Sequence, residues 1–461
     1  MKPITDKAYR LFHAGSIALA QVESNGMRID TEYLKRAVAH STQTIATITT
    51  QLKEDKIFRL WRRKFGSRTN IGSREQLGRI LFTIMDYPCP SYTKTGRPKV
   101  DKNTLDNIDL DFVKRFIKLE QLKKVVTTYL GGILRETTDG FLHPFFSLHL
   151  VQTMRGQSDH PNFQNIPIRD PKMAKLVRRA FISRPGYQLV ETDYSGAEIC
   201  CAACYHKDPR MISYIKDNTK DLHRDVAGQC YILRKDLITK EIRYCGKNMF
   251  IFPQFYGDFY PDCARHLWEA ISRMHLKTTE GKNLKIHLRE QGITKLGACN
   301  PEESPKEGTF EKHIQEVEND FWNKRFKVYG QWKKDWYYSY LKKGYFNTLT
   351  GFRIAGDYKR NQVINYPVQG SAFHWLLWSL IRIQKLLNKY KMKSLIIGQI
   401  HDSIVADVHE KELKDYLQIV KQVMTIDIRQ YWKWIIVPLA IEAEVSPVNG
   451  SWYEKKEMEI I

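Results

Sequence analysis

The stretch YQLVETDYSGAE, residues 187–198, decides the fold. Its first six residues predict a strand that runs into Asp193, with a helix beyond it. A strand pair is predicted near residues 396–408, and Asp402 lies at the turn between its strands. If both segments share one sheet, two carboxylates meet at strand ends and the helical sequence between them folds to one side. Rigid paired carboxylates suit two-magnesium phosphoryl transfer, although either aspartate alone is more often a turn residue.

A predicted helix between the two aspartates carries a pair of cations, Arg243 and Lys247. Their four-residue spacing puts both on one helix face, which suits the binding of a triphosphate. Aromatic residues follow on which a nucleotide base could stack: Phe250, Phe252, Phe255 and Tyr256. An aromatic stripe on a helix more often faces a core, so the stripe alone leaves both interpretations open.

Taken together, these segments resemble the sequence motifs of family A DNA polymerases. Asp193–Glu198 resembles motif A, Arg243–Gly257 resembles motif B, and His401-Asp402 resembles motif C. Other segments similar to the family are TMRG at 153–156, PNFQNIP at 161–167, DLHR at 221–224, TLTG at 348–351 and NYPVQG at 365–370. Ser73-x2-Gln76-Leu77 and Lys94-Thr95-Gly96 look like parts of the thumb. The resemblance covers most of the chain.

The resemblance implies a role for each motif residue. Asp193 and Asp402, with the backbone carbonyl of Tyr194, would bind two Mg²⁺ ions per active site. The incoming dNTP would be held by Glu198, which crowds the sugar 2′ position, and by His223, Arg243, Lys247, Phe252 and Tyr256. Primer–template DNA would be contacted by Arg155, Asn165, Asn365, Gln369 and His401.

The resemblance also implies an α+β right-hand polymerase with an antiparallel-sheet palm, helical fingers and a helical thumb. The expected division is an N-terminal palm-associated helix at 1–30, the thumb at 31–140, the palm at 141–205 and 345–461, and the fingers at 206–344. A polar insertion near 278–313 interrupts the fingers. Because Thr278–His313 is rich in Lys and Glu and has no apolar periodicity over much of its length, it is interpreted as solvated.

Two departures from the family pattern lead to further predictions. Motif C usually continues with Glu, but Ser403 follows Asp402, and a neutral hydroxyl is a weak ligand for hard cations. Motif B is one residue longer than usual, and nine residues of regular helix would put Lys247 and Tyr256 on opposite sides. Since Pro253 also lacks an N–H, a π-type bulge or kink near 249–253 is predicted. Phe252, rather than Ile251, is then expected under the incoming sugar.

Composition agrees with a nucleic-acid partner. The chain has 73 Lys and Arg against 51 Asp and Glu, a formal charge of +22, which suits a polyanion. No apolar stretch approaches the ~20 residues of a membrane span, and no signal peptide is seen, so no membrane partner and a cytoplasmic location are expected. Cys201 and Cys204 are interpreted as reduced thiols on a helix, because no second pair stands at zinc spacing.

The function expected from the resemblance is template-directed DNA synthesis, in phage rather than bacterial replication. Matches begin near the N-terminus, so no exonuclease domain and no proofreading are expected, and a separate exonuclease or processivity protein is a candidate partner. One alternative is a single-subunit RNA polymerase, which shares the two aspartates but has no use for Glu198. A second is a non-catalytic DNA-binding scaffold, against which the retained Asp193, Asp402, Arg243 and Lys247 argue.

Overall fold

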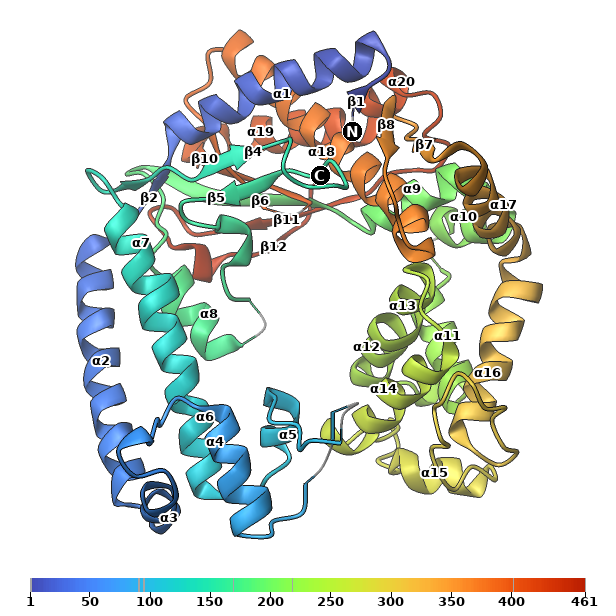
Figure 1. Ribbon diagram of the computed structural model, residues 1–461. Coiled ribbons are helices and arrows are strands. Elements are labelled where there is room, and N and C mark those ends of the chain that lie inside the picture. The colour runs from blue at the N-terminus through green and yellow to red at the C-terminus, as the bar shows by residue number, and fades with distance from the viewer. Residues whose placement is uncertain are drawn as a thin grey trace.

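A five-stranded antiparallel sheet lies at the centre of the computed structural model, which describes residues 2–89, 92–93, 96–168, 170–217, 219–400 and 402–460 (Figure 1). The strand order is β12-β11-β6-β10-β9. The strands are β6 (Tyr187–Tyr194), β9 (Leu395–Ile400), β10 (Ser403–His409), β11 (Ile441–Val445) and β12 (Lys456–Met458). Because β6 pairs with β10, the condition under which the two aspartates would meet is fulfilled.

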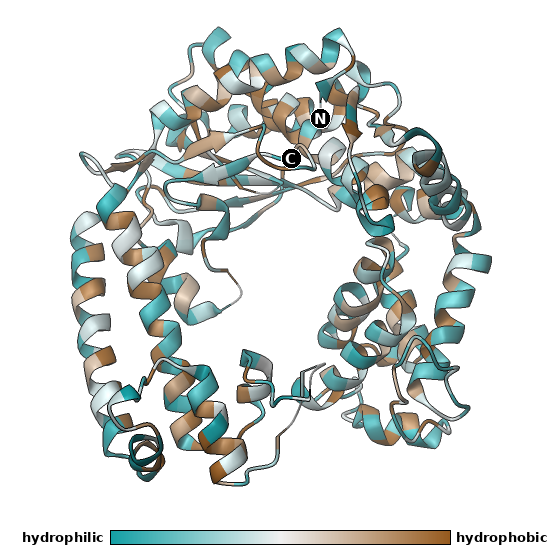
Figure 2. Ribbon diagram, viewed as in Figure 1, coloured by the Kyte–Doolittle hydropathy of each residue, from teal (hydrophilic) through white to brown (hydrophobic). Residues whose placement is uncertain are grey.

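Apolar helices cover one face of this sheet (Figures 1 and 2). They include α1 (Asp6–Asn25), α9 (Ala197–His206), α18 (Arg360–Lys389), α19 (Leu413–Lys421) and α20 (Ile428–Tyr431). Trp375 of α18 is fully buried in the same core as Ile404 of β10. The next residue along the strand, Val405, joins a second core with Trp452 on the other face. This alternation is the period of two expected for a strand buried on both faces.

Short strands tie the N-terminal residues to the body of the molecule. A three-stranded sheet has the order β1 (Lys2–Pro3), β8 (Phe352–Ala355) and β7 (Tyr345–Asn347). Two further pairs are β2 (Met27–Arg28) with β3 (Phe141–Leu142), and β4 (Phe145–Ser147) with β5 (Gln157–Asp159). Because α1 also packs against α18 and β9, the first helix is part of the layer that supports the central sheet.

A first helical arm extends from the sheet, at the left in Figure 1. It contains α2 (Thr31–Glu54), α3 (Lys56–Phe65), α4 (Arg74–Gly78), α5 (Lys102–Asp106), α6 (Asp111–Lys124) and α7 (Gly131–Glu136). The arm has a core of its own around Trp61. The Trp61 indole Nε1–H donates to Gln76 Oε1 over 2.8 Å, and the Ser73 hydroxyl caps α4 by accepting from the Gln76 N–H. These two bonds explain the three-residue spacing of Ser73 and Gln76. Lys94 and Thr95, in the other predicted thumb segment, lie outside the described residues.

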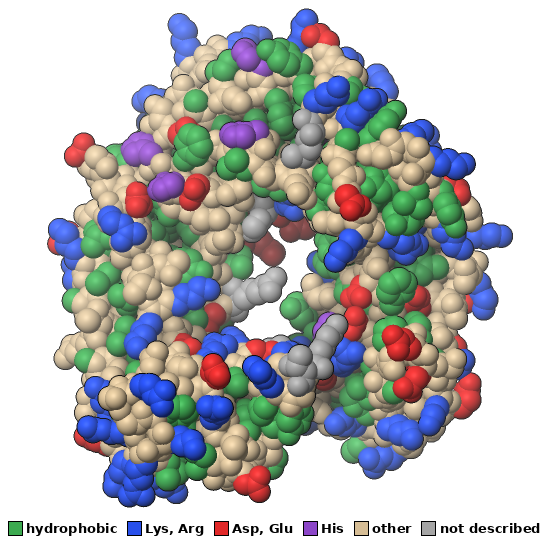
Figure 3. All heavy atoms as spheres, in the orientation of Figure 1, with side chains coloured by type: hydrophobic (Ala, Val, Ile, Leu, Met, Phe, Trp, Pro, Cys, Tyr) green, Lys and Arg blue, Asp and Glu red, His purple; other side chains and the backbone are tan. Residues whose placement is uncertain are grey.

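A second helical arm stands opposite, at the right in Figure 1. It contains α10 (Pro209–Lys216), α11 (Leu222–Tyr231), α12 (Lys240–Gly246), α13 (Phe252–Phe255), α14 (Tyr260–Arg273), α15 (Leu284–Glu290), α16 (Phe310–Asp320) and α17 (Lys327–Lys343). α8 (Pro171–Arg178) lies on the other side of the opening. Figure 3 shows a hollow between the arms, with Lys and Arg side chains around it. The arms correspond to the segments predicted as thumb and fingers, whose exact boundaries stay a prediction.

The interpretation of residues 278–313 as solvated is wrong for several apolar residues of the segment, although most of its residues are exposed. Leu284 and Leu288 of α15 are fully buried, and Ile293 and Phe310 belong to the same core. The ring nitrogen Nε2 of His287 also lies 2.9 Å from the backbone oxygen of Ile232. Leu284 and Leu288 are four residues apart and share one helix face, but charged neighbours hide this short pattern in the sequence.

The cysteines agree with the interpretation as buried thiols. Cys201 and Cys204 lie in α9, and seven of the eight cysteines, all described, are buried; Cys89 is partly exposed. Burial raises the pKa of the Cys204 thiol, so it stays protonated and unreactive at neutral pH. Among the described residues, no helix is both long and apolar enough to cross a lipid bilayer.

Candidate active site

The strand register brings the two predicted metal ligands together. Asp193, near the end of β6, is paired with Ser403, the first residue of β10, and Asp402 immediately precedes Ser403. Asp193 keeps some access to solvent, but partial desolvation of its carboxyl by the surrounding protein raises its pKa to about 7. The nearby charges of Asp402 and Glu191 add to this effect. Two neighbouring carboxylates repel each other's charge, and a bound cation relieves that repulsion. His401, predicted to contact DNA, lies outside the described residues.

Further carboxylates share this face of the sheet. Glu442 of β11 is paired with Asp193, and Glu444 is paired with Glu191, so all four point to one side. Lys455, almost wholly buried, forms ion pairs with Glu191 and with Glu444, the latter at 2.9 Å. The Ser195 hydroxyl donates to Glu442 over 2.9 Å. Lys455 therefore neutralises the pair of Glu191 and Glu444. Among the described residues, no lysine forms an ion pair with Asp193 or Glu442.

The donor set around Asp193 fits magnesium. Carboxylate oxygens are hard ligands, and Mg²⁺ is typically held by one or two of them together with substrate phosphates and water. Among the described residues, no group of three His, Cys, Asp or Glu side chains is arranged to hold a metal by itself, so the two aspartates would need ligands from a substrate. The Tyr194 side chain points into the core, where its hydroxyl lies 2.9 Å from Ser379 Oγ; its backbone carbonyl is the group that could assist.

Arg155 connects this carboxylate pair to the predicted sugar-selecting residue. Its Nη2 donates to Asp402 Oδ1 over 3.2 Å, and its Nη1 lies 3.6 Å from Glu198 Oε1. The Tyr256 hydroxyl donates to the other oxygen of Glu198 in a short hydrogen bond. Burial raises the pKa of Glu198, and Tyr256 is its hydrogen-bond donor. Glu198 is thus held in a fixed position between motif B and the two aspartates.

The residues predicted to bind the triphosphate also come together. Arg243 Nε lies 2.7 Å from Asp221 Oδ2, which orients its guanidinium beside His223. A cavity of about 600 Å³ is lined by both residues and by Gly196 of motif A. Burial lowers the pKa of His223 to about 4, with the nearby Lys247 and Arg243 charges contributing, so the imidazole is neutral at pH 7. Its Nδ1 is buried and, within the described part of the chain, has no hydrogen-bond partner.

The predicted bulge in motif B is confirmed. Residues Lys247–Ile251 form a π-helix, and regular α-helix resumes at Phe252–Phe255 with Pro253 in its first turn. Ile251 is fully buried, whereas the Phe252 ring is partly exposed and stacks on Tyr256 with ring centroids 6.1 Å apart. The Lys247 ammonium lies 5.4 Å from the centre of the Phe252 ring. The extra residue is therefore absorbed so that Lys247, Phe252 and Tyr256 share one side; the contact of Phe252 with a sugar stays a prediction.

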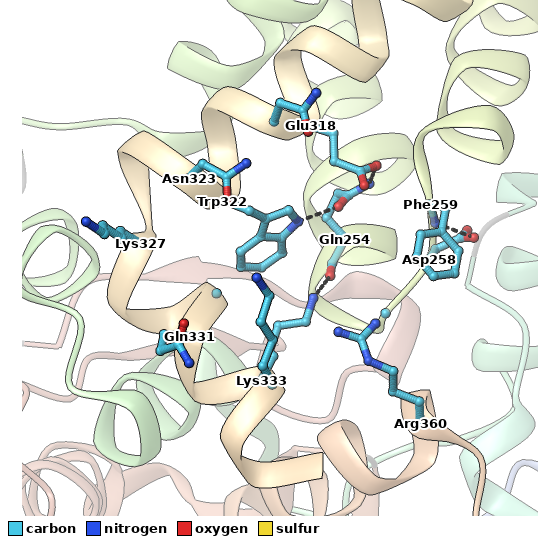
Figure 4. Close-up of a pocket in the computed structure, with 14 residues that line it drawn as sticks. Gln254, Asp258, Phe259, Glu318, Trp322, Asn323, Lys327, Gln331, Lys333 and Arg360 are labelled. Carbon is cyan, nitrogen blue, oxygen red and sulfur yellow. Dashed lines mark hydrogen bonds between the residues drawn. The ribbon is translucent and has the colours of Figure 1, made fainter. Parts of the chain in front are cut away.

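Motif B is anchored from behind by a polar cluster that the sequence analysis missed (Figure 4). Gln254, 1% exposed, donates to Glu318 over 2.7 Å and accepts from the Trp322 indole over 2.6 Å. The Lys333 ammonium donates to the Gln254 backbone oxygen and lies 3.8 Å from the centre of the Trp322 ring. Burial lowers the pKa of Lys333 to about 7. No local pattern could have found this cluster, because its members are 64 to 79 residues from Gln254.

Two of the predicted DNA-binding residues lie beside the end of motif B. Asn365 donates to the backbone oxygen of Tyr256 over 2.9 Å, and Gln369 lines a small cavity with Glu198, Phe252 and Tyr256. Asn165 is exposed at the end of a short 3₁₀ helix. Among the described residues, no hydrogen bond joins Asn165 to another predicted site residue.

Comparison with known proteins gives consistent matches. The family model described as DNA polymerase family A matches residues 35–278 and 312–454, so the gap falls within the insertion. DNA polymerase I of Lactococcus lactis subsp. cremoris is 27% identical over 458 residues, covering 95% of this chain and 45% of that protein. The DNA polymerase of Bacillus phage SP01 is 26% identical over 415 residues, covering 85% of this chain and 41% of that protein. The chain spans less than half the length of these relatives.

A solved structure shows the fold. The polymerase domain of Pol1 from M. smegmatis, in complex with DNA primer-template and dNTP, superposes with a TM-score of 0.72 at 23% sequence identity. The match covers 96% of this chain and 70% of that chain. The predicted α+β right-hand fold, with an antiparallel-sheet palm and helical fingers and thumb, is thereby confirmed.

Proposed function

This chain belongs to DNA polymerase family A, and we propose that it is a template-directed DNA polymerase that adds dNTPs to a primer 3′-hydroxyl. The observation that carries the proposal is the pairing of Asp193 with Ser403, which sets Asp402 beside Asp193 where β6 ends and β10 begins. Opposite this pair, His223 and Arg243 line a cavity that also reaches motif A. One site thus combines carboxylates for cations with donors for a triphosphate.

In the proposed reaction the primer hydroxyl oxygen bonds to the α-phosphorus of the dNTP as the bond from that phosphorus to the β-phosphate oxygen breaks. Pyrophosphate leaves, and the hydroxyl proton passes to solvent. Asp193 and Asp402 would hold two Mg²⁺ ions, which neutralise charge on the reacting phosphate. Arg243 and Lys247 would contribute positive charge to the triphosphate, and the neutral His223 would donate a hydrogen bond.

Deoxyribose selection is assigned to Glu198. Its carboxylate is fixed by Tyr256 and faces Arg155, so a 2′-hydroxyl there would meet a side chain that cannot move aside. A single-subunit RNA polymerase is the competing function, and comparing the incorporation of dNTPs and rNTPs separates the two. We expect the wild type to prefer dNTPs and Glu198→Ala to relax that preference; equal use of rNTPs by the wild type would support the RNA polymerase.

Primer–template DNA is the proposed partner. The support is the formal charge of +22 and the hollow between the arms, together with the M. smegmatis structure, which is a complex with DNA primer-template and dNTP. Arg155, Asn365 and Gln369 lie close enough to the nucleotide site to contact the primer end, and Asn165 and His401 are assigned to DNA on sequence resemblance. Binding should weaken steeply with salt, because phosphate contacts release counterions.

Primer extension by the purified chain tests the proposal. Wild-type protein should extend a primer with Mg²⁺ and dNTPs, whereas Asp193→Ala and Asp402→Ala should not, because each removes a cation ligand. Both variants should still bind primer–template, measured by fluorescence anisotropy. A wild type that binds DNA but never extends it would instead support a non-catalytic scaffold. Near-normal turnover by either variant would overturn the metal assignment.

Phage DNA replication in a host cytoplasm is the biological role we infer, with a separate exonuclease or processivity protein as a candidate partner. The support is the similarity to the Bacillus phage SP01 polymerase and the lengthened motif B. Deleting the gene from the genome that carries it should stop replication of that genome in an otherwise normal host. Unchanged DNA yield after deletion would contradict this role.

A further inference from the structure

Ser403 stands beside the metal-binding aspartates at a position where the family usually has a glutamate. Its side chain is 4% exposed and does not point freely into the cleft. Its hydroxyl oxygen lies 2.9 Å from Glu191 Oε1 and 2.9 Å from the Ile400 backbone oxygen. The residue that follows Asp402 is therefore bonded to a carboxylate of the neighbouring strand, β6.

Glu191 is held from three directions. Besides the Ser403 hydroxyl, the Trp452 indole donates to Glu191 Oε2 over 2.9 Å, and Lys455 forms an ion pair with the same oxygen. The Lys455 side chain is only 3% exposed. Glu191 thereby links β6 to the start of β10 and to the C-terminal segment. It lies two residues before Asp193 in β6, and its partner Ser403 directly follows Asp402.

A glutamate at position 403 would be incompatible with Glu191. The Ser403 hydroxyl already lies within hydrogen-bond distance of Glu191, so a carboxylate built from position 403 would enter the same space. Two like charges in a site with little access to water repel each other strongly. Lys455, the nearby cation, is already shared with Glu444. Positions 191 and 403 therefore accommodate one carboxylate between them.

We propose that Glu191 is the positioning residue of this metal site, supplying from β6 the carboxylate that the family usually carries after the motif C aspartate. By accepting from Ser403, Glu191 fixes the first residue of β10, which is adjacent to Asp402 and paired with Asp193. The inference rests on the proposed function, because it concerns the same two aspartates. Groups that orient metal ligands in this way typically change metal affinity by 10- to 100-fold when they are removed.

A carboxylate swap tests the proposal with the metal alone as probe. Mn²⁺ binding to the DNA-free full chain is measured by electron paramagnetic resonance for Glu191→Ala, Ser403→Glu and the double variant. Each single variant should bind Mn²⁺ about tenfold more weakly, the first by loss of positioning and the second because repulsion between the two carboxylates displaces the start of β10 next to Asp402. The double variant has one carboxylate again and should return to within about threefold of the wild type.

Glu444→Ala is the matched control, because Glu444 shares Lys455 with Glu191 but its side chain is 49% exposed and makes no bond to Ser403. It should leave Mn²⁺ binding unchanged. If Glu191→Ala does not fold, judged by circular dichroism, Glu191→Met replaces it in both the single and the double variant, since it fills a similar space but offers no carboxylate acceptor to Ser403.

Two outcomes overturn the role of Glu191. One is unchanged Mn²⁺ affinity in the Glu191 single variant, and the other is a double variant whose loss equals or exceeds the product of the two single losses. Primer extension by the wild type is measured in parallel. If the wild type extends primers but the variants do not show the expected loss and recovery of Mn²⁺ binding, only the role of Glu191 is overturned. If the wild type extends no primer, the proposed function is overturned, whatever the Mn²⁺ titrations give.

Discussion

Arg155 Nη2 lies 3.2 Å from Asp402 Oδ1, so one of the two proposed metal ligands is already paired with a cation of the protein. The same guanidinium faces Glu198. For Arg155 to contact a primer–template, and for Asp402 to bind a metal, this ion pair has to open. In the DNA-free state the Arg155 guanidinium thus competes with a metal ion for the Asp402 carboxylate.

Removing that competitor should strengthen metal binding. We expect Arg155→Ala to bind Mn²⁺ several-fold more tightly than the wild type in the absence of DNA, since a hydrogen bond to a charged group contributes about 1.5–3 kcal/mol net of solvent exchange. Primer extension should nevertheless fall, because a DNA contact is lost. Titration followed by electron paramagnetic resonance checks the first expectation. Arg155→Lys keeps a cation and should resemble the wild type; weaker Mn²⁺ binding by Arg155→Ala would refute the competition.

Metal affinity should depend on pH through Asp193. Its pKa is raised from 3.8 to about 7, so between these values the folded protein holds a proton that a metal must displace. Mn²⁺ affinity should rise about tenfold per pH unit from pH 5 and level off above pH 7. A flat affinity between pH 5 and pH 7 would contradict the raised pKa.

The same shift predicts how stability changes with pH. Because the folded state binds this proton more tightly than the unfolded state, the stability that Asp193 contributes falls as pH rises from about 4 to about 7. Asp193→Asn mimics the protonated form and lacks the titration. Its free energy of unfolding in urea should exceed that of the wild type by a margin that is larger at pH 8 than at pH 5. A smaller margin at pH 8 than at pH 5 would show that the sign is wrong.

Phe252→Tyr should raise the incorporation of dideoxynucleotides relative to dNTPs. The added hydroxyl can replace the hydrogen bond of the missing sugar 3′-hydroxyl, and about 1.4 kcal/mol corresponds to about tenfold in selectivity. Competitive primer termination measures the ratio. Phe255→Tyr makes the same change on a buried residue of the same helix and should leave the ratio unaltered. An unchanged ratio in Phe252→Tyr would show that Phe252 does not lie under the sugar.

Gln254→Ala should destabilise the second arm. It leaves the Trp322 indole N–H and the Glu318 carboxylate without their buried partner, at a cost of about 1–3 kcal/mol each. Urea unfolding provides the measurement. Gln331→Ala alters the same pocket at an exposed position and should change stability by less than about 0.5 kcal/mol. Equal stability of the two variants would mean that the cluster around Gln254 adds nothing.

Leu288→Ala tests whether the insertion is part of the core. Leu288 is fully buried, so its truncation should cost about 2–5 kcal/mol. Ile286, in the same helix, is 53% exposed and serves as the control, whose truncation should cost little. Similar small losses in both variants, measured by thermal unfolding, would restore the view of a solvated insertion.

The sequence carried enough information to predict the catalytic geometry wherever the relevant signal is local. The strand patterns before Asp193 and around Asp402 showed that both aspartates end strands, but only the structure shows that these strands pair. Counting helical turns from Lys247 to Tyr256 predicted the π-helix, and the burial of Ile251 agrees with the choice of Phe252.

Contacts that depend on tertiary register could not be predicted in this way. Glu191 meets Lys455 only because β6, β11 and the C-terminal segment align, and 264 residues separate the two in sequence. Gln254 and Lys333 likewise meet across two packed helices. The buried face of α15 was in principle visible as Leu284 and Leu288, but two leucines among charged residues are too weak a pattern to distinguish from a solvated helix.

The distribution of cysteines offers a route to watching the first arm move. Of the eight cysteines, all within the described residues, Cys89 alone is partly exposed, and the other seven are buried. A thiol-reactive fluorophore should therefore attach at residue 89 of the unaltered chain, in the segment between α4 and α5 of the first arm. Energy transfer from this single dye to an acceptor on the primer would then report arm movement in real time, with no engineered cysteine needed.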